Sequence, residues 1–364
     1  MTESALIVTQ TASITDGLVS LVSAQGYDQV RTVVTDRPEY GEYYLSPATI
    51  ERVEKQSSAK LLLVVDGTLH PGQAVDLGAR LPQVTLRDKR STVWEHLSEE
   101  NPVARARFAL RQARLTRRKV ATAQRDGATK SPTGTSGRLA TREQQVQECQ
   151  TSLETQQETA RERVESTYNS VDGRVVLLGR IGSPTTKLWN RLTGSNEPAG
   201  AGRPAQPTTA TATVGPHTLA VVDTPGIPGN DDFPDWLLET VPGLMASVKQ
   251  ATCVLGVGHR CTALHDAVCD QFAVQWRSVE SATAAAARDA VRDCFETVTY
   301  AVQLPYSDAA HALIADLHDR TTVHEIEYGD KIQLCIEISQ TWTDELGRRV
   351  STVGGERQRL DEAK

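Results

Sequence analysis

Two short, wholly apolar runs constrain this chain more than any other feature. Residues 61–65 read Leu-Leu-Leu-Val-Val and end at Asp66-Gly67, and residues 175–178 read Val-Val-Leu-Leu and end at Gly179. Apolar runs of this length between turn residues indicate strands that are buried on both faces. Strands of that kind belong to parallel sheets covered by helices. The sequence therefore predicts an α/β protein.

The 364 residues divide into five segments by pattern and composition. Residues 1–100 alternate short apolar runs with helical patterns, which predicts an N-terminal α/β domain. Residues 172–296 repeat that alternation as a second α/β domain, and residues 297–345 read as a small α+β domain with a hairpin turn at Gly329-Asp330. The polar residues 346–364 are expected to form a flexible tail.

Residues 101–171 differ in character and predict an antiparallel helical hairpin. Proline and glycine are absent from residues 103–126, whereas Gly, Ser, Thr and Pro crowd a predicted loop at 126–137. Residues 141–170 then carry an apolar stripe made only of Val146, Leu153, Ala160 and Val164. A stripe this thin indicates an exposed projection rather than a core.

Bulk composition excludes several classes of protein. Hydrophobic residues make up 39% of the chain and no apolar run is long enough to cross a bilayer, so we expect no membrane association. The N-terminus lacks the pattern of a signal peptide, which indicates a cytoplasmic protein. The six cysteines are scattered, which favours reduced thiols. A net charge of −7 argues against nucleic-acid binding over the whole surface but leaves room for a local basic patch.

The apolar run at 175–178 is followed by a glycine and a helical pattern, which is the layout of a phosphate-binding loop. Against the pattern G-x-x-x-x-G-K-[ST], the first glycine is Gly179 and the last hydroxyl is Thr186. Pro184 and Thr185 replace the second glycine and the lysine, and Lys187 comes two residues late. Proline has no N–H for a phosphate and threonine carries no charge, so an ordinary strand–turn–helix also fits. The candidate phosphate contacts are Gly179, Gly182, Ser183, Thr185 and Thr186.

A second short motif, Asp223-Thr-Pro-Gly226, follows the predicted strand at 219–222. In GTPases and ATPases an aspartate at such a strand end holds Mg²⁺, and contacts to the terminal phosphate order the segment that follows. Asp223 and Thr186 are therefore candidate magnesium ligands, and Gly226 is the candidate sensor of the terminal phosphate. The same four residues also make an ordinary turn.

The order of these motifs resembles the HflX family of translational GTPases over nearly the whole chain. Residues 175–194, which end in Leu-Trp-Asn-Arg-Leu-Thr-Gly, are similar to the family's phosphate loop and its helix. Residues 206–209 look like the end of switch I, and residues 223–226 with Leu237 and Leu238 look like switch II. Residues 304–308 and the hairpin after them are similar to the family's C-terminal domain.

The resemblance implies binding of GTP with Mg²⁺ and association, as a monomer, with the large ribosomal subunit and its RNA. It carries base contacts over to Ser281, Ala282 and Thr283. The family's switch I threonine falls on Pro204, so Thr208 or Thr209 reaches the metal only if the loop shifts. The Asn-Lys-x-Asp motif that selects guanine has no match, and residues 257–279 leave too little chain for its strand. The resemblance therefore implies a truncated G domain and leaves GTP hydrolysis open.

Basic residues crowd the predicted helix that follows Asn101. Arg107, Arg111, Arg114 and Arg118 are spaced by four, three and four residues, which places their guanidinium groups along one face. Charge pattern alone favours a face packed against acidic neighbours. Arginine also makes bidentate contacts with phosphate, and the resemblance implies that this stripe binds ribosomal RNA.

Cys261, His265 and Cys269 are spaced by four and share a predicted helix face. A zinc site would suit that spacing, but close cysteine pairs from turns are missing, so small buried thiols are the default interpretation.

Two functions stay open on the sequence. The first is a ribosome-associated protein that binds GTP or GDP, favoured by Asp223 and residues 281–283. The second is a non-enzymatic binding module that uses the G domain only as a scaffold, favoured by Pro184, Thr185 and the missing guanine motif.

Overall fold

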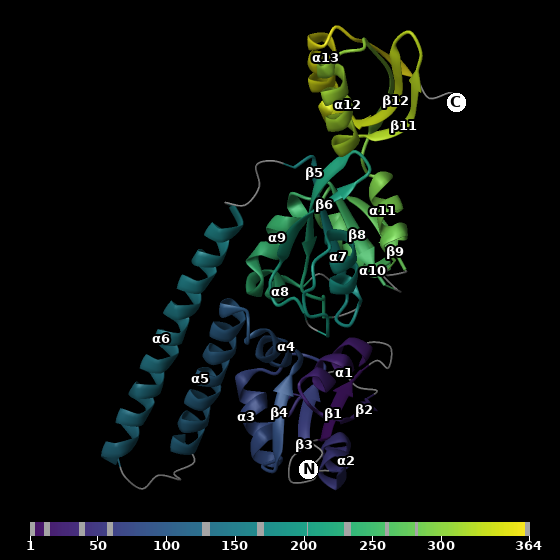
Figure 1. Ribbon diagram of the computed structural model, residues 1–364. Coiled ribbons are helices and arrows are strands. Elements are labelled where there is room, and N and C mark those ends of the chain that lie inside the picture. The colour runs from purple at the N-terminus through teal and green to yellow at the C-terminus, as the bar shows by residue number, and fades with distance from the viewer. Residues whose placement is uncertain are drawn as a thin grey trace.

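The computed structural model describes residues 4–10, 15–35, 41–56, 61–125, 132–165, 171–201, 203–228, 234–258, 262–280 and 283–360. Figure 1 shows three sheet-containing domains in a row, with a long helical hairpin beside the first two. The prediction of an α/β protein is confirmed. None of the helices in the described ranges is long and apolar enough to span a membrane.

The N-terminal domain is built on a four-stranded parallel sheet in the order β2-β1-β3-β4. The strands are β1 Ser4–Thr9, β2 Gln29–Val34, β3 Leu61–Val65 and β4 Val84–Asp88. Helices α1 Thr15–Ala24 and α4 Lys89–Leu97 cover one face, and α2 Pro47–Gln56 and α3 Pro71–Arg80 cover the other. This double cover is why β3 is apolar and buried at every position.

The helical hairpin consists of α5 Pro102–Arg125 and α6 Pro132–Glu165. Asn101 caps α5 by accepting from the Ala104 N–H at 3.0 Å, and Pro102 occupies the first helical position. The helix α6 begins inside the segment predicted as loop. The apolar contact between the two helices is small and centres on Leu110 and Leu153, so the thin stripe is confirmed for Val146, Leu153 and Ala160; the side chain of Val164 lies outside the described residues.

The central domain has a five-stranded sheet in the order β6-β7-β5-β8-β9, in which only β6 is antiparallel. The strands are β5 Gly173–Gly179, β6 Thr208–Val214, β7 His217–Asp223, β8 Cys253–Val257 and β9 Gln275–Val279. Helices α7 Thr185–Thr193 and α11 Ala284–Arg292 cover one face, and α8 Asp235–Thr240, α9 Pro242–Lys249 and α10 Thr262–Gln271 the other. Helices α8 and α9 are separate because Pro242 starts a new helix.

The N-terminal and central domains share one hydrophobic core. Leu18 and Leu21 of α1 belong to the same buried cluster as Val176, Leu178 and Ile227 of the central domain. The two sheets are therefore joined by apolar packing as well as by the chain.

The C-terminal domain is an antiparallel sheet in the order β11-β12-β10-β13 with α12 Asp308–Arg320 and α13 Thr343–Thr352 packed on it. Its strands are β10 Thr297–Leu304, β11 Thr322–Tyr328, β12 Ile332–Ser339 and β13 Glu356–Leu360, and a 3₁₀ turn covers Gln340–Trp342. The prediction of a flexible tail over 346–364 is wrong up to residue 360, because α13 and β13 complete this domain. Residues 361–364 lie outside the described ranges.

Candidate functional site

The loop between β5 and α7 lies where the sequence predicted a phosphate-binding loop. Strand β5 is central in its sheet and ends at Gly179, and α7 starts at Thr185. Gly182, with φ of 91°, lets the chain turn so that the Ser183 N–H donates to the Arg180 carbonyl at 2.9 Å. The layout of strand, turn and helix is therefore present, and Lys187 points to solvent as its late position predicted.

Three backbone N–H groups of this loop, those of Arg180, Ile181 and Ser183, are used inside the protein. The Arg180 N–H donates to the Ser183 hydroxyl at 3.1 Å, and the Ile181 N–H donates to the Ile227 carbonyl at 3.2 Å. Pro184 has no N–H and is the residue that precedes the first turn of α7. A phosphate-binding loop needs N–H groups that curl around an anion, and three of the groups that this loop could offer are already paired while Pro184 offers none.

Asp223, at the end of β7, is 1% exposed and lies against the first turn of α7. Burial raises the pKa of its carboxyl group to about 7, although hydrogen bonds with the Thr186 and Thr185 side chains and the Thr224 backbone act in the opposite direction. Its Oδ1 atom has no hydrogen-bond partner among the described residues. The acid is therefore surrounded by neutral groups and holds a proton in much of the population at neutral pH.

The two candidate magnesium ligands, Asp223 and Thr186, lie beside each other. The Thr186 hydroxyl donates to the Arg203 carbonyl at 3.2 Å, which leaves its lone pairs for a cation or for a protonated Asp223. Thr209 is opposite Val222 in the sheet, whereas Thr208 is the residue opposite Asp223.

Gly226 packs directly against the loop. A β-carbon at this position would lie 2.7 Å from the Ile181 Cα atom, closer than side chains and backbone approach in proteins. The next residue, Ile227, forms a parallel bridge with Arg180 and donates its N–H to the Gly179 carbonyl at 2.9 Å. Gly226 therefore packs against the loop at a distance that only glycine allows.

The N-terminal domain covers the same loop from outside. Ile181 is 7% exposed and belongs to the core cluster that contains Leu18 and Leu21 of α1. A β-carbon at Gly17 of α1 would lie 3.3 Å from the Ile181 carbonyl oxygen, so helix and loop are in backbone contact.

Two further segments of the central domain are fixed by α4 and the start of α5. The Asn101 side-chain amide donates to the Ala205 carbonyl at 2.9 Å, and the Trp94 indole N–H donates to the Thr240 hydroxyl at 3.0 Å. Sequence reasoning missed both anchors. The Asn-Pro pair at 101–102 is a helix-start signal that reveals the cap, but no local pattern reveals a contact with residue 205.

The base-contacting motif is only partly visible. Ser281 and Ala282 lie outside the described residues. Thr283 is exposed and caps α11 by accepting from the Ala286 N–H at 3.4 Å. Between β8 and β9 the described residues hold only α10, which agrees with the expected loss of one strand.

The structure divides the predicted arginine stripe in two. Arg111 donates to Asp88 at 2.6 Å and to the Leu69 carbonyl at 3.1 Å, and Arg107 pairs with Glu239 at 2.8 Å. Arg118 is half-buried and only Arg114 is exposed. The expectation of an RNA-facing stripe is wrong for Arg107 and Arg111, because this face of α5 packs on acidic neighbours in the first two domains.

The candidate zinc residues do not come together. Cys261 lies outside the described residues, and His265 pairs with Asp266 at 2.8 Å and packs edge-on against Trp276. The described ranges contain no group of three His, Cys, Asp or Glu side chains that could hold a metal.

The chain matches no protein-family model. It also matches no curated protein. Among solved structures it is similar to a GTP-binding protein from the hyperthermophilic archaeon Sulfolobus solfataricus in complex with GDP, with 10% identity and a TM-score of 0.39 over 80% of this chain and 98% of that chain. It is similar to the complex of SsGBP with GDP at 15% identity and a TM-score of 0.39, over 71% of this chain and 72% of that chain. Likenesses at this level are distant and carry no conclusion about ligands.

Proposed function

We propose that this protein is a non-hydrolysing binding protein built on a GTPase-like scaffold. The closure of the loop at 179–186 carries this proposal. The N–H groups of Arg180, Ile181 and Ser183 donate to Ser183, Ile227 and Arg180, and Gly226 packs against the Ile181 backbone. Incoming phosphates would have to break these contacts and would find no lysine in return.

The segments that correspond to the switches also support a scaffold. GTPases work through segments that become ordered by the terminal phosphate and are released on hydrolysis. Here the chain around Ala205 is tied to Asn101, and α8 is tied to Trp94 and Arg107. These ties use only the protein's own residues, so Ala205 and α8 are held in place without a nucleotide.

Isothermal titration of the full chain with GTP, GDP and ATP, each with Mg²⁺, tests the proposal. We expect no binding heat at millimolar nucleotide. Saturable binding of any of the three that Asp223→Asn abolishes would overturn the proposal, because it would show that the loop opens and that Asp223 ligates a metal.

We further propose that the partner is a structured RNA bound by the outer half of the hairpin, with the large ribosomal subunit as the first candidate from the resemblance. Arg114, Arg117, Lys119 and Arg125 are exposed on α5, and Arg138 is exposed on α6. In the described part of the chain none of these five cations has an ion pair. Free cations on a projecting helix suit a phosphate backbone.

Binding to purified large ribosomal subunits over a range of salt concentrations tests the partner. Arg114→Glu/Arg117→Glu/Lys119→Glu is expected to weaken binding at least tenfold and to reduce the salt dependence by about three charges. The matched control Lys55→Glu/Lys249→Glu/Lys331→Glu changes the net charge equally at exposed sites elsewhere. An equal loss of affinity in both variants would show that binding depends only on net charge and not on the hairpin. Absence of binding at low salt would exclude the ribosomal partner.

A further inference from the structure

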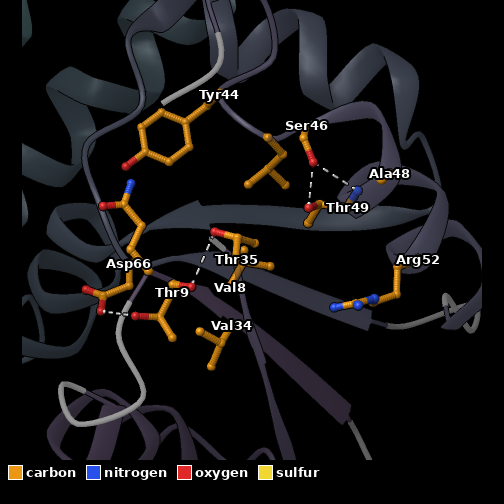
Figure 2. Close-up of a pocket in the computed structure, with 12 residues that line it drawn as sticks. Val8, Thr9, Val34, Thr35, Tyr44, Ser46, Ala48, Thr49, Arg52 and Asp66 are labelled. Carbon is orange, nitrogen blue, oxygen red and sulfur yellow. Dashed lines mark hydrogen bonds between the residues drawn. The ribbon is translucent and has the colours of Figure 1, made fainter. Parts of the chain in front are cut away.

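The N-terminal domain has a cavity of about 240 Å³ at the carboxyl ends of its strands. Figure 2 shows Thr9 at the end of β1, Thr35 after β2, Asp66 after β3 and the first turns of α2 around it. In the order β2-β1-β3-β4, the chain leaves β1 toward one edge of the sheet and returns to β3 on the other side. Parallel α/β sheets bind ligands in the crevice at such a switch point.

Arg52 gives this cavity an uncompensated positive charge. Its side chain extends from the exposed side of α2, and its guanidinium group points toward the middle of the cavity in Figure 2. No ion pair of Arg52 occurs among the described residues. Among the described residues of the lining, Asp66 is the only acidic one, and its buried side chain pairs with Lys89 at 3.1 Å.

Hydroxyl oxygens lie across the cavity from Arg52. The Thr9 hydroxyl donates to Asp66 Oδ2 at 2.9 Å, and the Thr35 hydroxyl donates to the Thr9 carbonyl at 3.4 Å. Because its hydrogen is already used, the Thr35 hydroxyl can offer lone pairs to a ligand. This wall therefore accepts hydrogen bonds, whereas Arg52 donates them.

Tyr44 forms another wall in a strained conformation. Its φ is 64°, in the left-handed region that residues other than glycine rarely adopt. The ring lies so close over the turn at Gly67 that a β-carbon there would collide with the Tyr44 hydroxyl. Strained backbone conformations of this kind occur most often at ligand-binding and active sites, where the surrounding structure stabilises them.

We propose that this cavity binds a small hydroxylated anion, represented by a sugar phosphate. Its anionic group would lie on Arg52, because a guanidinium group binds phosphate or carboxylate through paired hydrogen bonds. A hydroxyl group of the ligand would donate to the Thr35 hydroxyl oxygen. The volume lies below the ~300–1,000 Å³ typical of drug-sized ligands, which suits a monosaccharide phosphate rather than a nucleotide.

Calorimetric titration of the full chain with ribose 5-phosphate, ribonate, free ribose and inorganic phosphate tests this proposal. We expect saturable binding of ribose 5-phosphate, with ribose and inorganic phosphate each at least tenfold weaker. Arg52→Gln is expected to weaken binding at least tenfold. Lys55→Gln, an equal charge change at an exposed position of α2 outside the cavity, should leave the affinity unchanged.

The remaining outcomes separate the parts of the proposal. Binding of ribonate at the affinity of ribose 5-phosphate supports the site and identifies the anion subsite as general for carboxylate and phosphate. Inorganic phosphate binding as tightly as ribose 5-phosphate overturns the role of Thr35. No binding of any anionic probe, or equal affinity in Arg52→Gln with an unchanged melting temperature, overturns the site. The site lies apart from the loop at 179–186, so these results are independent of the nucleotide titrations.

Discussion

Asp223 is a buried acid with no cation beside it. Its pKa of about 7 means that the folded protein keeps a proton that the unfolded chain, with an aspartate pKa of about 4, releases. Between these values the folded state binds more protons, so the contribution of Asp223 to stability falls as pH rises from about 4 to about 7. Above pH 7 the contribution is constant. We therefore expect Asp223→Asn to be more stable than the wild type at pH 8, by up to roughly 4 kcal/mol.

Urea unfolding at pH 5 and pH 8 in a metal chelator measures this difference. The gain of Asp223→Asn over the wild type should be larger at pH 8, whereas the exposed control Asp270→Asn should show no comparable gain. If Asp223→Asn is the less stable protein at pH 8, or if Mg²⁺ stabilises the wild type, Asp223 acts as a metal ligand instead.

Gly226 tests the closure of the loop without changing any charge. An added methyl group would meet the Ile181 backbone at 2.7 Å, so Gly226→Ala should lower the free energy of unfolding by about 1–3 kcal/mol. Gly78→Ala is the matched control, because it adds the same methyl group in α3 with nothing within 4 Å. Alanine is the better helix former, so that control should gain about 0.5–1 kcal/mol. Urea unfolding of both variants measures the contrast, and an unchanged Gly226→Ala would mean that the loop has room to open.

At the scale of elements, the sequence predicts the helices and strands whose residues follow a regular apolar or capping pattern. The apolar run of β3 and the Asn-Pro start of α5 identify their elements directly. Strand β13, Glu-Arg-Gln-Arg-Leu, is exposed at every position and is held by backbone pairing with β10, so it has no apolar period. Helix α4 was missed because it follows β4 with no linker, and Asp88 both ends the strand and caps the helix.

The arginines of α5 show the same division between local pattern and distant contact. Their spacing predicts a common face, but Asp88, which neutralises Arg111, is fully buried in another element. Removing one partner of a buried ion pair costs about 3–5 kcal/mol, so Arg111→Gln should be strongly destabilising. Arg114→Gln, on the exposed part of the same helix, should stay within about 0.5 kcal/mol of the wild type. Thermal and urea unfolding distinguish the two variants. If Arg111→Gln and Arg114→Gln are equally stable, Arg111 is again a candidate for binding RNA.

At the scale of the whole molecule, the candidate site was predictable only in part. Pro184 and Thr185 are visible in the sequence as lost phosphate contacts. The cover of the loop by Leu18 and Leu21 is not visible there, because it joins residues more than 150 positions apart. The cover of the loop at 179–186 therefore depends on the core shared by the N-terminal and central domains and not on the sequence of the loop itself.

That shared core makes a prediction about how the molecule unfolds. Leu18 is buried in the cluster that joins the N-terminal and central domains, whereas Leu317 is buried in the separate core of the C-terminal domain. Truncating a buried leucine to alanine costs about 2–5 kcal/mol. Leu18→Ala should therefore lower hydrogen-exchange protection together in β1, β3, β5 and β8, and leave β10 and β12 unchanged. Leu317→Ala should do the reverse. If Leu18→Ala affects only β1 and β3, the two domains unfold independently and α1 does not hold the loop at 179–186 closed.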